Sequence, residues 1–302
     1  MKQQTLRSIY TFEGNGLHTG QYGRMKICPA EVNQGIYFVR TDLPGQPVVK
    51  ALAENITNTA RSTTISSNGA DVVTIEHIMS ALSGLGVDNA RIELQGIEVP
   101  ILDGSAKPYV DAVTADGLAV QDAERQYVEI PRTIEVNDPQ SGAFVRIEPA
   151  AEPSIDLTVD FNSRVLGVQK AHWDEGTDYA AAIGSCRTFV FFHEIAFLAQ
   201  KGLVKGGNVD NAIVIVEHPV TEEQIDSLCS LLDLPKLQVT SGGYLNNLQL
   251  RFPDECGRHK LLDLIGDLRL AGGYLRAKVT AFKSGHTINS LATKAIREAV
   301  KN

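Results

Sequence analysis

The chain lacks the cysteine patterns that would hold a small domain together or bind a structural metal. Its four cysteines, Cys28, Cys186, Cys229 and Cys256, are scattered along 302 residues, and no C-x-x-C pair occurs. Four widely spaced thiols are too few for a disulfide framework and wrongly spaced for a zinc ribbon. We therefore expect buried free thiols.

Long apolar runs are also missing. The longest, such as Ala212–Val216, are far shorter than the roughly 20 residues that a membrane span needs. The first residues, MKQQTLRSIYTFEG, lack the apolar core of a signal peptide. We therefore expect a soluble, cytoplasmic protein without stable membrane insertion.

Positive charge is scarce overall but not at the C-terminal end. The chain has 28 Lys and Arg against 36 Asp and Glu, a net charge of −8, which argues against nonspecific binding to nucleic acid. From Arg251 to Asn302, however, ten basic residues stand against five acidic ones. This local excess suggests a small anionic substrate, and nothing in the sequence implies an oligomer.

The first part of the chain predicts short strands followed by a helix. Thr74 is a suitable N-cap, and the apolar spacing of IEHIMSALSGLG predicts a helix that ends at Gly84 or Gly86. A strand over Ala90–Leu94 and a second helix after Ser105 follow. The length of 302 residues favours two domains, because single cores rarely grow beyond about 250–300 residues.

We place the domain boundary in the polar segment Gln121–Gln126, which gives domains 1–124 and 125–302. The segments YVEIPRTIEV, AFVRIEP and SIDLTVDF predict new strands after it. The later elements that we expect are a helix at Phe192–Lys201, a helix at Arg258–Leu270, a strand at Leu275–Phe282 and a terminal helix from about Ser290.

A short internal echo links the two halves. The pattern H-x-x-x-x-L-x-G begins at His77 and again at His259, each time in a helix that leads into a strand. The echo is too short to prove a duplication. We expect an α+β fold of two similar domains, each a β-sheet with packed helices, that form a sandwich with the helix layer between the sheets.

His259 and Asp263 are the first candidate metal ligands. They are four residues apart, so they share a helix face and can bind a single ion. The pattern H-x-x-x-D often occurs by chance. An ordinary hydrogen bond on the helix surface therefore stays open as the alternative. Asp267 adds a second carboxylate one turn further on.

Glu76 and His77 form the second candidate pair. Neighbouring helical residues diverge by about 100°, so both can border one cleft while only His77 binds metal. A carboxylate beside metal-bound water is the general base that a zinc hydrolase needs. Two histidines and one aspartate would leave a coordination position open for water. The alternative is an amphipathic helix that carries a polar pair.

His286 follows a predicted strand and a glycine in AFKSGHTIN, so we expect it in a loop, where catalytic side chains gather. An ordinary exposed histidine is the alternative. Arg258, Lys260 and Lys283 lie near these groups in sequence, which is compatible with a phosphate-bearing substrate. A solvated charged face stays open as the alternative for the lysines.

Several longer blocks carry a family resemblance. TIEHIMSALSGLGVDNARIEL, VPILDGSA, CRTF, RHKLLDLIGDL and FKSGHTIN, together with GNGLHTG and RTDL, lie in order from about residue 14 to 289. As a set they resemble the bacterial UDP-3-O-acyl-N-acetylglucosamine deacetylase (LpxC) family. The resemblance implies a zinc enzyme that hydrolyses the N-acetyl group of this UDP-linked acylated amino sugar and releases acetate, the committed step of lipid A synthesis.

The resemblance also implies roles for particular residues. His77, His259 and Asp263 match the ligands of the catalytic zinc, although iron(II) suits such a set nearly as well. Glu76 matches the general base, and His286 matches the cation that stabilises the oxyanion and protonates the leaving amine. A bell-shaped pH–rate profile is the expected consequence.

Further matches concern positioning and substrate binding. Asp267 matches the carboxylate that orients the histidine, and Thr188 matches a hydroxyl that donates to the oxyanion. Lys260 resembles a lysine near the sugar and phosphates, while Phe161 and Phe189 resemble aromatic groups of the substrate pocket.

An apolar passage for the fatty acyl chain is the last feature that the resemblance implies. Ordinary core packing is the alternative for each of its residues. The matching positions are Leu17, Phe192, Ile195, Val204, Ala212 and Val214.

Two other functions stay open at this point. One is a nucleotide-sugar binding homologue that lacks catalysis, and the other is a zinc deacetylase that acts on a different amide. Acetate release from the authentic substrate would separate them.

Overall fold

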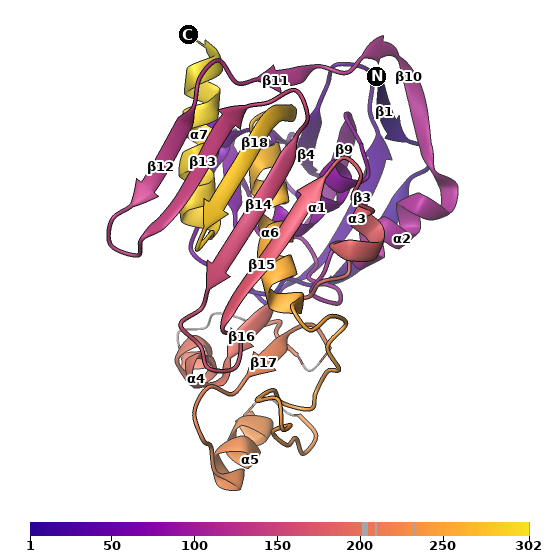
Figure 1. Ribbon diagram of the computed structural model, residues 1–302. Coiled ribbons are helices and arrows are strands. Elements are labelled where there is room, and N and C mark those ends of the chain that lie inside the picture. The colour runs from indigo at the N-terminus through magenta and orange to yellow at the C-terminus, as the bar shows by residue number, and fades with distance from the viewer. Residues whose placement is uncertain (201–204, 209, 232–233, 302) are drawn as a thin grey trace.

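The computed structural model describes residues 1–200, 205–208, 210–231 and 234–301 (Figure 1). The first half is built on a five-stranded sheet with three antiparallel pairings and one parallel pairing, β9–β4. In order across the sheet, the strands are β2 (Tyr10–Asn15), β3 (Tyr22–Pro29), β9 (Ala90–Gln95), β4 (Ile36–Arg40) and β5 (Val48–Lys50).

The second half repeats this topology strand for strand, with the parallel pair β18–β14 at its centre. A further short strand, β11 (Tyr127–Glu129), joins this sheet beside β18. In order, the other strands are β12 (Ile134–Asp138), β13 (Ala143–Pro149), β18 (Tyr274–Phe282), β14 (Ser154–Asp160) and β15 (Val168–Asp174). The echo in the sequence therefore reflects a repeated fold.

Each half also carries two helices, one on either side of its central strand in sequence. In the first half these are α1 (Glu76–Gly84) and α2 (Lys107–Asp116), and in the second α6 (Glu255–Arg269) and α7 (His286–Lys301). In Figure 1, α1, α6 and α7 lie between the two sheets. This arrangement confirms the predicted α+β sandwich with a helix layer inside it.

The buried helix α1 shows why the sequence adopts this layout. Every residue from Glu76 to Leu82 is buried, because the helix packs against α6 on one side and its own sheet on the other. Strand β14 instead alternates, with Ile155, Leu157 and Val159 inward and polar residues between them, as a sheet with one solvated face requires.

Each repeated unit contains one insertion. Between β5 and α1 lie η1 (Ala53–Asn55) and a small sheet of β6 (Ile56–Asn58), β7 (Thr64–Ser67) and β8 (Ala70–Val72).

Most of the second insertion, between β15 and α6, protrudes at the lower end of Figure 1, whereas its short helix α3 (Tyr179–Ala182) lies higher, at the right of the picture. Tyr179 and Ile183 at α3 belong to the main core, and the protruding part has two small cores of its own. The other elements of this insertion are β16 (Phe189–Phe191), α4 (Phe192–Gln200), β17 (Ile213–Ile215) and α5 (Glu222–Leu231).

The boundary near residue 125 stays a prediction, because one hydrophobic core runs through both halves. Most of the polar segment chosen for this boundary belongs to a strand that the sequence did not predict. Residues up to Glu124 belong to β10 (Leu118–Glu124), which pairs with β1 (Lys2–Leu6). A two-stranded ribbon with polar edges needs few apolar residues, so composition concealed the strand.

Two helix starts and one cap also differ from expectation. α6 begins at Glu255, three residues before Arg258, and α7 begins at His286 rather than near Ser290. Thr74 does not cap α1: its φ is +60°, and its hydroxyl donates to Glu98 instead. None of the helices in the described part of the chain has the length and apolar character that crossing a bilayer requires.

The central helices α1 and α6 approach each other closely at Gly266. A Cβ atom there would lie 2.1 Å from the carbonyl oxygen of Glu76 and 3.1 Å from the backbone nitrogen of Ser80. The missing side chain therefore sets the distance between α6 and the first turn of α1.

We expect Gly266→Ala to lower the free energy of unfolding by about 1–3 kcal/mol, because a buried methyl group would press on backbone that has no rotamer to change. Urea denaturation measures this. Gly176→Ala is the control, since a Cβ atom at position 176 would lie 3.5 Å from its nearest neighbour, Asp174 Oδ1. Equal effects of the two substitutions would contradict the close contact.

Candidate metal centre and catalytic site

Three predicted ligands meet in the helix layer. His77 comes from α1, while His259 and Asp263 come from successive turns of α6. Asp263 Oδ1 lies 3.7 Å from His77 Nε2 and 3.4 Å from His259 Nε2, and all three side chains are buried. Ligand atoms of a tetrahedral zinc site lie about 3.3 Å apart, given bonds of roughly 2.0–2.2 Å. The triad therefore has the dimensions of a metal site.

The bonding of these groups supports the same conclusion. His259 Nδ1 donates to the carbonyl oxygen of Cys186 at 3.1 Å, which leaves the lone pair of Nε2 pointing at Asp263. Asp263 Oδ1 is buried and has no hydrogen-bond partner in the described structure. A carboxylate oxygen that faces the lone pairs of neutral imidazoles is repelled unless a cation lies between them. The residues present therefore fit a divalent metal ion.

The electrostatics keep the ligands in their metal-binding forms. Burial lowers the pKa of His77 to about 3 and also lowers that of His259, so both imidazoles are neutral at pH 7. Burial opposes ionisation of Asp263, but His259 and Lys260 beside it bring its pKa below the ordinary value. Lys260 Nζ donates to Asp263 Oδ2 at 2.9 Å.

Glu76 lies at the start of α1, one residue before the metal ligand His77. Its Oε2 accepts a hydrogen bond from the backbone nitrogen of Thr63 at 3.0 Å, which fixes the carboxylate in place. Burial, above all, raises the pKa of Glu76 to about 7. A carboxylate with that pKa can take up and release a proton near neutral pH.

His286 was expected in a loop, and the structure places it instead as the first residue of α7. Its Nδ1 lies 3.0 Å from Asp267 Oδ2, and its Nε2 lies 3.8 Å from Glu76 Oε1. Burial alone would lower the pKa of His286, but the Asp267 and Glu76 carboxylates raise it to about 9. A cationic imidazole therefore faces the carboxylate of Glu76.

Two residues that the sequence did not single out hold this pair in position. The hydroxyl of Thr63 donates to Asp267 Oδ1 at 2.6 Å, and Asn289 Nδ2 donates to Asp267 Oδ2 at 2.9 Å. Thr63 thus touches both Asp267 and, through its backbone, Glu76. Asn289 could have been noticed because it belongs to the FKSGHTIN block. Thr63 lies in none of the blocks that carry the family resemblance, so nothing in the sequence singled it out.

The aromatic residues predicted for the substrate pocket lie beside the triad. The rings of Phe161 and Phe189 meet edge to face, with centroids 5.3 Å apart, and Phe189 lies 6.2 Å from the ring of His259. Lys260 Nζ lies 5.4 Å from the centre of the Phe189 ring. An anion near Lys260 would therefore have an apolar wall next to it.

Thr188 lies two residues beyond the carbonyl that orients His259. Its backbone nitrogen donates to Gly104 of the first half at 2.8 Å, and its backbone oxygen accepts from Ile213 at 2.9 Å. These bonds hold the CRTF block against the LDGS turn. Lys283, by contrast, lies apart from the triad's ion pairs, with its Nζ 3.7 Å from Asp160 Oδ2.

The residues predicted for an acyl passage are divided among several places. Phe192, Ile195 and Val214 belong to one of the small cores of the insertion. Leu17 is buried in the GLHTG turn, where its carbonyl oxygen accepts from Gly206 at 3.0 Å. The carbonyl oxygen of Ala212 accepts from the amide of Asn247, and Val204 lies outside the described residues. The passage stays a prediction.

Known proteins match this chain over nearly its whole length. The family model described as UDP-3-O-acyl N-acetylglycosamine deacetylase (LpxC) matches residues 3–227 and 236–298. A UDP-3-O-acyl-N-acetylglucosamine deacetylase of Trichormus variabilis is 38% identical over 295 residues, which are 96% of this chain and 96% of that protein. One of Saccharophagus degradans is 38% identical over 305 residues, covering 100% of this chain and 91% of that protein.

Some relatives are longer. The bifunctional enzyme LpxC/FabZ of Porphyromonas gingivalis is 41% identical over 300 residues, which are 99% of this chain but 65% of that protein. The counterpart from Bacteroides thetaiotaomicron is 39% identical, again over 65% of its length. The chain thus spans about two thirds of these bifunctional proteins.

We expect the purified protein to bind one divalent ion per chain at the triad. His77→Ala should weaken that binding at least ~100-fold, because loss of a ligand costs more than the 10–100-fold seen for outer-shell groups. Elemental analysis and competition with a chelator measure both. His172→Ala is the control, since His172 is an exposed histidine on β15. Unchanged metal affinity in His77→Ala would rule out the assigned centre.

Proposed function

The chain belongs to the UDP-3-O-acyl-N-acetylglucosamine deacetylase family, and on this basis we propose that it hydrolyses the N-acetyl group of UDP-3-O-acyl-N-acetylglucosamine and releases acetate. This reaction would be the committed step of lipid A synthesis. The observation that carries the proposal is the pair Glu76 and His286, which face each other at 3.8 Å beside three potential metal ligands.

His77, His259 and Asp263 would hold the metal, for which we propose zinc, with iron(II) as the alternative. When bound, such an ion polarises a carbonyl group and lowers the pKa of water to about 7. Three protein ligands leave one tetrahedral position for water or substrate. That is the donor set of catalytic rather than structural zinc sites.

Glu76 is the general base in this proposal. Its Oε2 is occupied by the backbone nitrogen of Thr63, so Oε1 is the oxygen that accepts the proton of the attacking water. Its pKa of about 7 lets the same carboxyl group pass that proton on later in the reaction. A carboxylate in water, with a pKa near 4.3, would be a weaker base for this purpose.

His286 is the general acid and the cation of the site. Asp267 binds its Nδ1 and thereby directs the N–H of Nε2 towards Glu76 and the space in which the amide would lie. A protonated imidazole there stabilises negative charge on the amide oxygen and can donate a proton to the leaving amine. We propose that Thr188 supplies a further hydroxyl donor to the oxyanion.

The substrate assignment rests on the surroundings of the triad. Lys260 is positioned by Asp263 and lies over Phe189, so a phosphate or sugar hydroxyl could reach it from the side of Phe161. We propose Lys283 as a second cation for the diphosphate. The acyl chain would extend towards the insertion, along Leu17, Phe192, Ile195, Val204, Ala212 and Val214.

We expect Glu76→Gln to lower kcat for acetate release by about 10²–10⁴-fold, because the amide cannot accept the proton of the attacking water. Elemental analysis should find the same metal content as in the wild type. The assay compares the UDP-linked acylated sugar with N-acetylglucosamine and an N-acetyl peptide. Wild-type turnover of the simple amides at equal rates would contradict the proposed substrate, and no acetate release at all would favour a binding protein.

We expect His286→Ala to lower kcat by about 10²–10³-fold with little change in KM, because the cation acts mainly on the charge that develops in the transition state. Steady-state kinetics on the same substrate measure this. His172→Ala serves again as the histidine control. Near-wild-type turnover of His286→Ala would show that the acid comes from elsewhere.

A further inference from the structure

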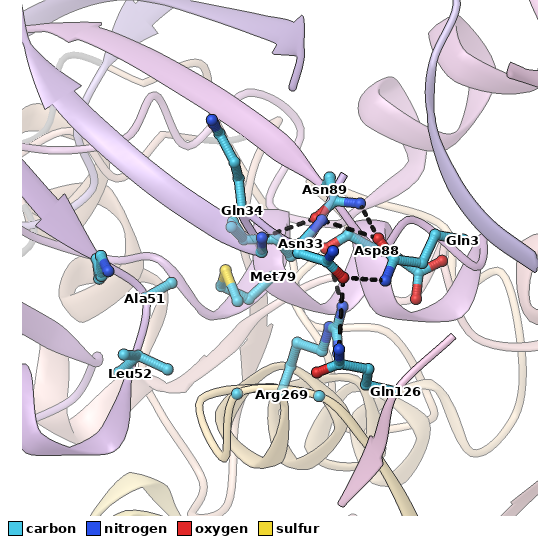
Figure 2. Close-up of a pocket in the computed structure, with 15 residues that line it drawn as sticks. Gln3, Asn33, Gln34, Ala51, Leu52, Met79, Asp88, Asn89, Gln126 and Arg269 are labelled. Carbon is cyan, nitrogen blue, oxygen red and sulfur yellow. Dashed lines mark hydrogen bonds between the residues drawn. The ribbon is translucent and has the colours of Figure 1, made fainter. Parts of the chain in front are cut away.

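A second polar cavity lies where the two halves of the chain and the segment between them meet (Figure 2). Its volume is about 170 Å³. Its walls come from the N-terminal strand, the turn before β4, the end of β5, the turn after α1, and the turn after α6. The lining residues that matter here are Gln3, Asn33, Lys50, Asp88, Asn89 and Arg269.

Arg269 supplies the buried positive charge and the free N–H donors of this cavity. Its side chain is 94% buried, since only 6% of the residue is exposed. Nη2 donates to the carbonyl oxygen of Val87 at 3.1 Å, whereas Nε and Nη1 have no hydrogen-bond partner in the described structure. The guanidinium lies 4.1 Å from the centre of the Tyr274 ring. Several of its N–H groups are therefore buried and unsatisfied.

Arg269 makes no direct ion pair with a described residue, and Asp88 acts on its charge only from beyond ion-pair distance. The nearest carboxylate in the cavity wall, Asp88, is already bound on both oxygens by Arg125, at 2.9 Å each, and by the backbone nitrogen of Gln4. Arginine cannot lose its proton in a protein. A buried, unpaired guanidinium is unfavourable unless an anion joins it.

One side of the wall is polar and held by hydrogen bonds, while Ile36, Ala51, Leu52 and Met79 are apolar lining residues. Gln3 Nε2 donates to Asn33 Oδ1 at 2.7 Å, Asn89 Nδ2 donates to Gln3 Oε1 at 2.8 Å, and Gly35 donates to Asn89 Oδ1 at 2.7 Å. Figure 2 shows Arg269 reaching from α6 towards these amides. Lys50 adds a second positive charge at the wall. The amide groups of Gln3 and Asn89 are bonded within the protein, so the unsatisfied N–H groups of Arg269 are the donors that a small anion would use.

Size limits what this cavity can hold. A cavity of about 150 Å³ accommodates a molecule of six heavy atoms such as benzene. The 170 Å³ here suits an ion of four to six heavy atoms and excludes a nucleotide. The site is also separate from the metal centre, because Arg269 follows Asp267 by two residues and so projects about 200° away around α6.

We propose that this cavity binds a small oxyanion, either a carboxylate such as acetate or inorganic phosphate, with Arg269 as its principal charge partner. The bound ion would join α6 of the second half to the turn after α1 of the first half. The inference does not depend on the proposed catalytic function.

Calorimetric titration and thermal unfolding of the metal-loaded protein test this, with sodium phosphate, sodium acetate and sodium chloride at constant ionic strength. We expect one of the two oxyanions to bind saturably and to raise Tm, and chloride to do neither. Arg269→Met should raise the Kd at least tenfold and remove the increase in Tm. Arg276→Gln should leave the Kd within twofold, because Arg276 is an exposed arginine that pairs with Glu129.

Lys50→Gln keeps the test decisive if Arg269→Met does not fold, since Lys50 is exposed at the surface. It should raise the Kd severalfold without changing Tm in the absence of anion. Anion binding at the metal centre would survive both substitutions unchanged. That outcome would overturn the proposal, as would no saturable binding or an equal response to chloride.

Discussion

The close contact between α1 and α6 is the constraint on which the site depends. Gly266 lets the backbone of α6 touch the first turn of α1, and that turn carries Glu76 and His77. With a wider separation, His77 could not reach the same point as His259 and Asp263. The two sheets bury this contact from both sides, so the ligands are held neutral or ionised by burial and by one another rather than by solvent.

The two halves contribute unequally to the site although their topology is the same. In the proposed site the first half would supply one metal ligand and the base, while the second would supply two ligands and the histidine–aspartate pair. The two insertions supply contacts that position the side chains of the site. Thr63 in the first insertion connects Glu76 to Asp267, and Cys186 in the second orients His259 through its carbonyl oxygen. The buried ion pair of Arg187 with Glu255 fixes that second insertion to the start of α6.

Much of this could be predicted from the sequence because local spacing carries it. The helical repeat places His259 and Asp263 on one face, and the echo at His77 anticipates two matching helices. Two supporting contacts could not be predicted: Thr63 donates to Asp267 from 204 residues away, and the backbone carbonyl of Cys186 accepts from His259. Neither contact leaves a pattern in the chain. The start of α7 at His286 was missed because Ser284 and Gly285 resemble a turn. The strand β10 was missed because its partner is the distant N-terminus.

The repeated fold has one more consequence, which concerns symmetry. Aligning the two copies of H-x-x-x-x-L-x-G makes His77 equivalent to His259 and makes Ala81 equivalent to Asp263. An aspartate in both copies would offer four protein groups to an ion, the number typical of structural zinc sites. With alanine at position 81, the chain offers only His77, His259 and Asp263. In the proposed centre this departure from two-fold equivalence would leave room for water or substrate beside the ion.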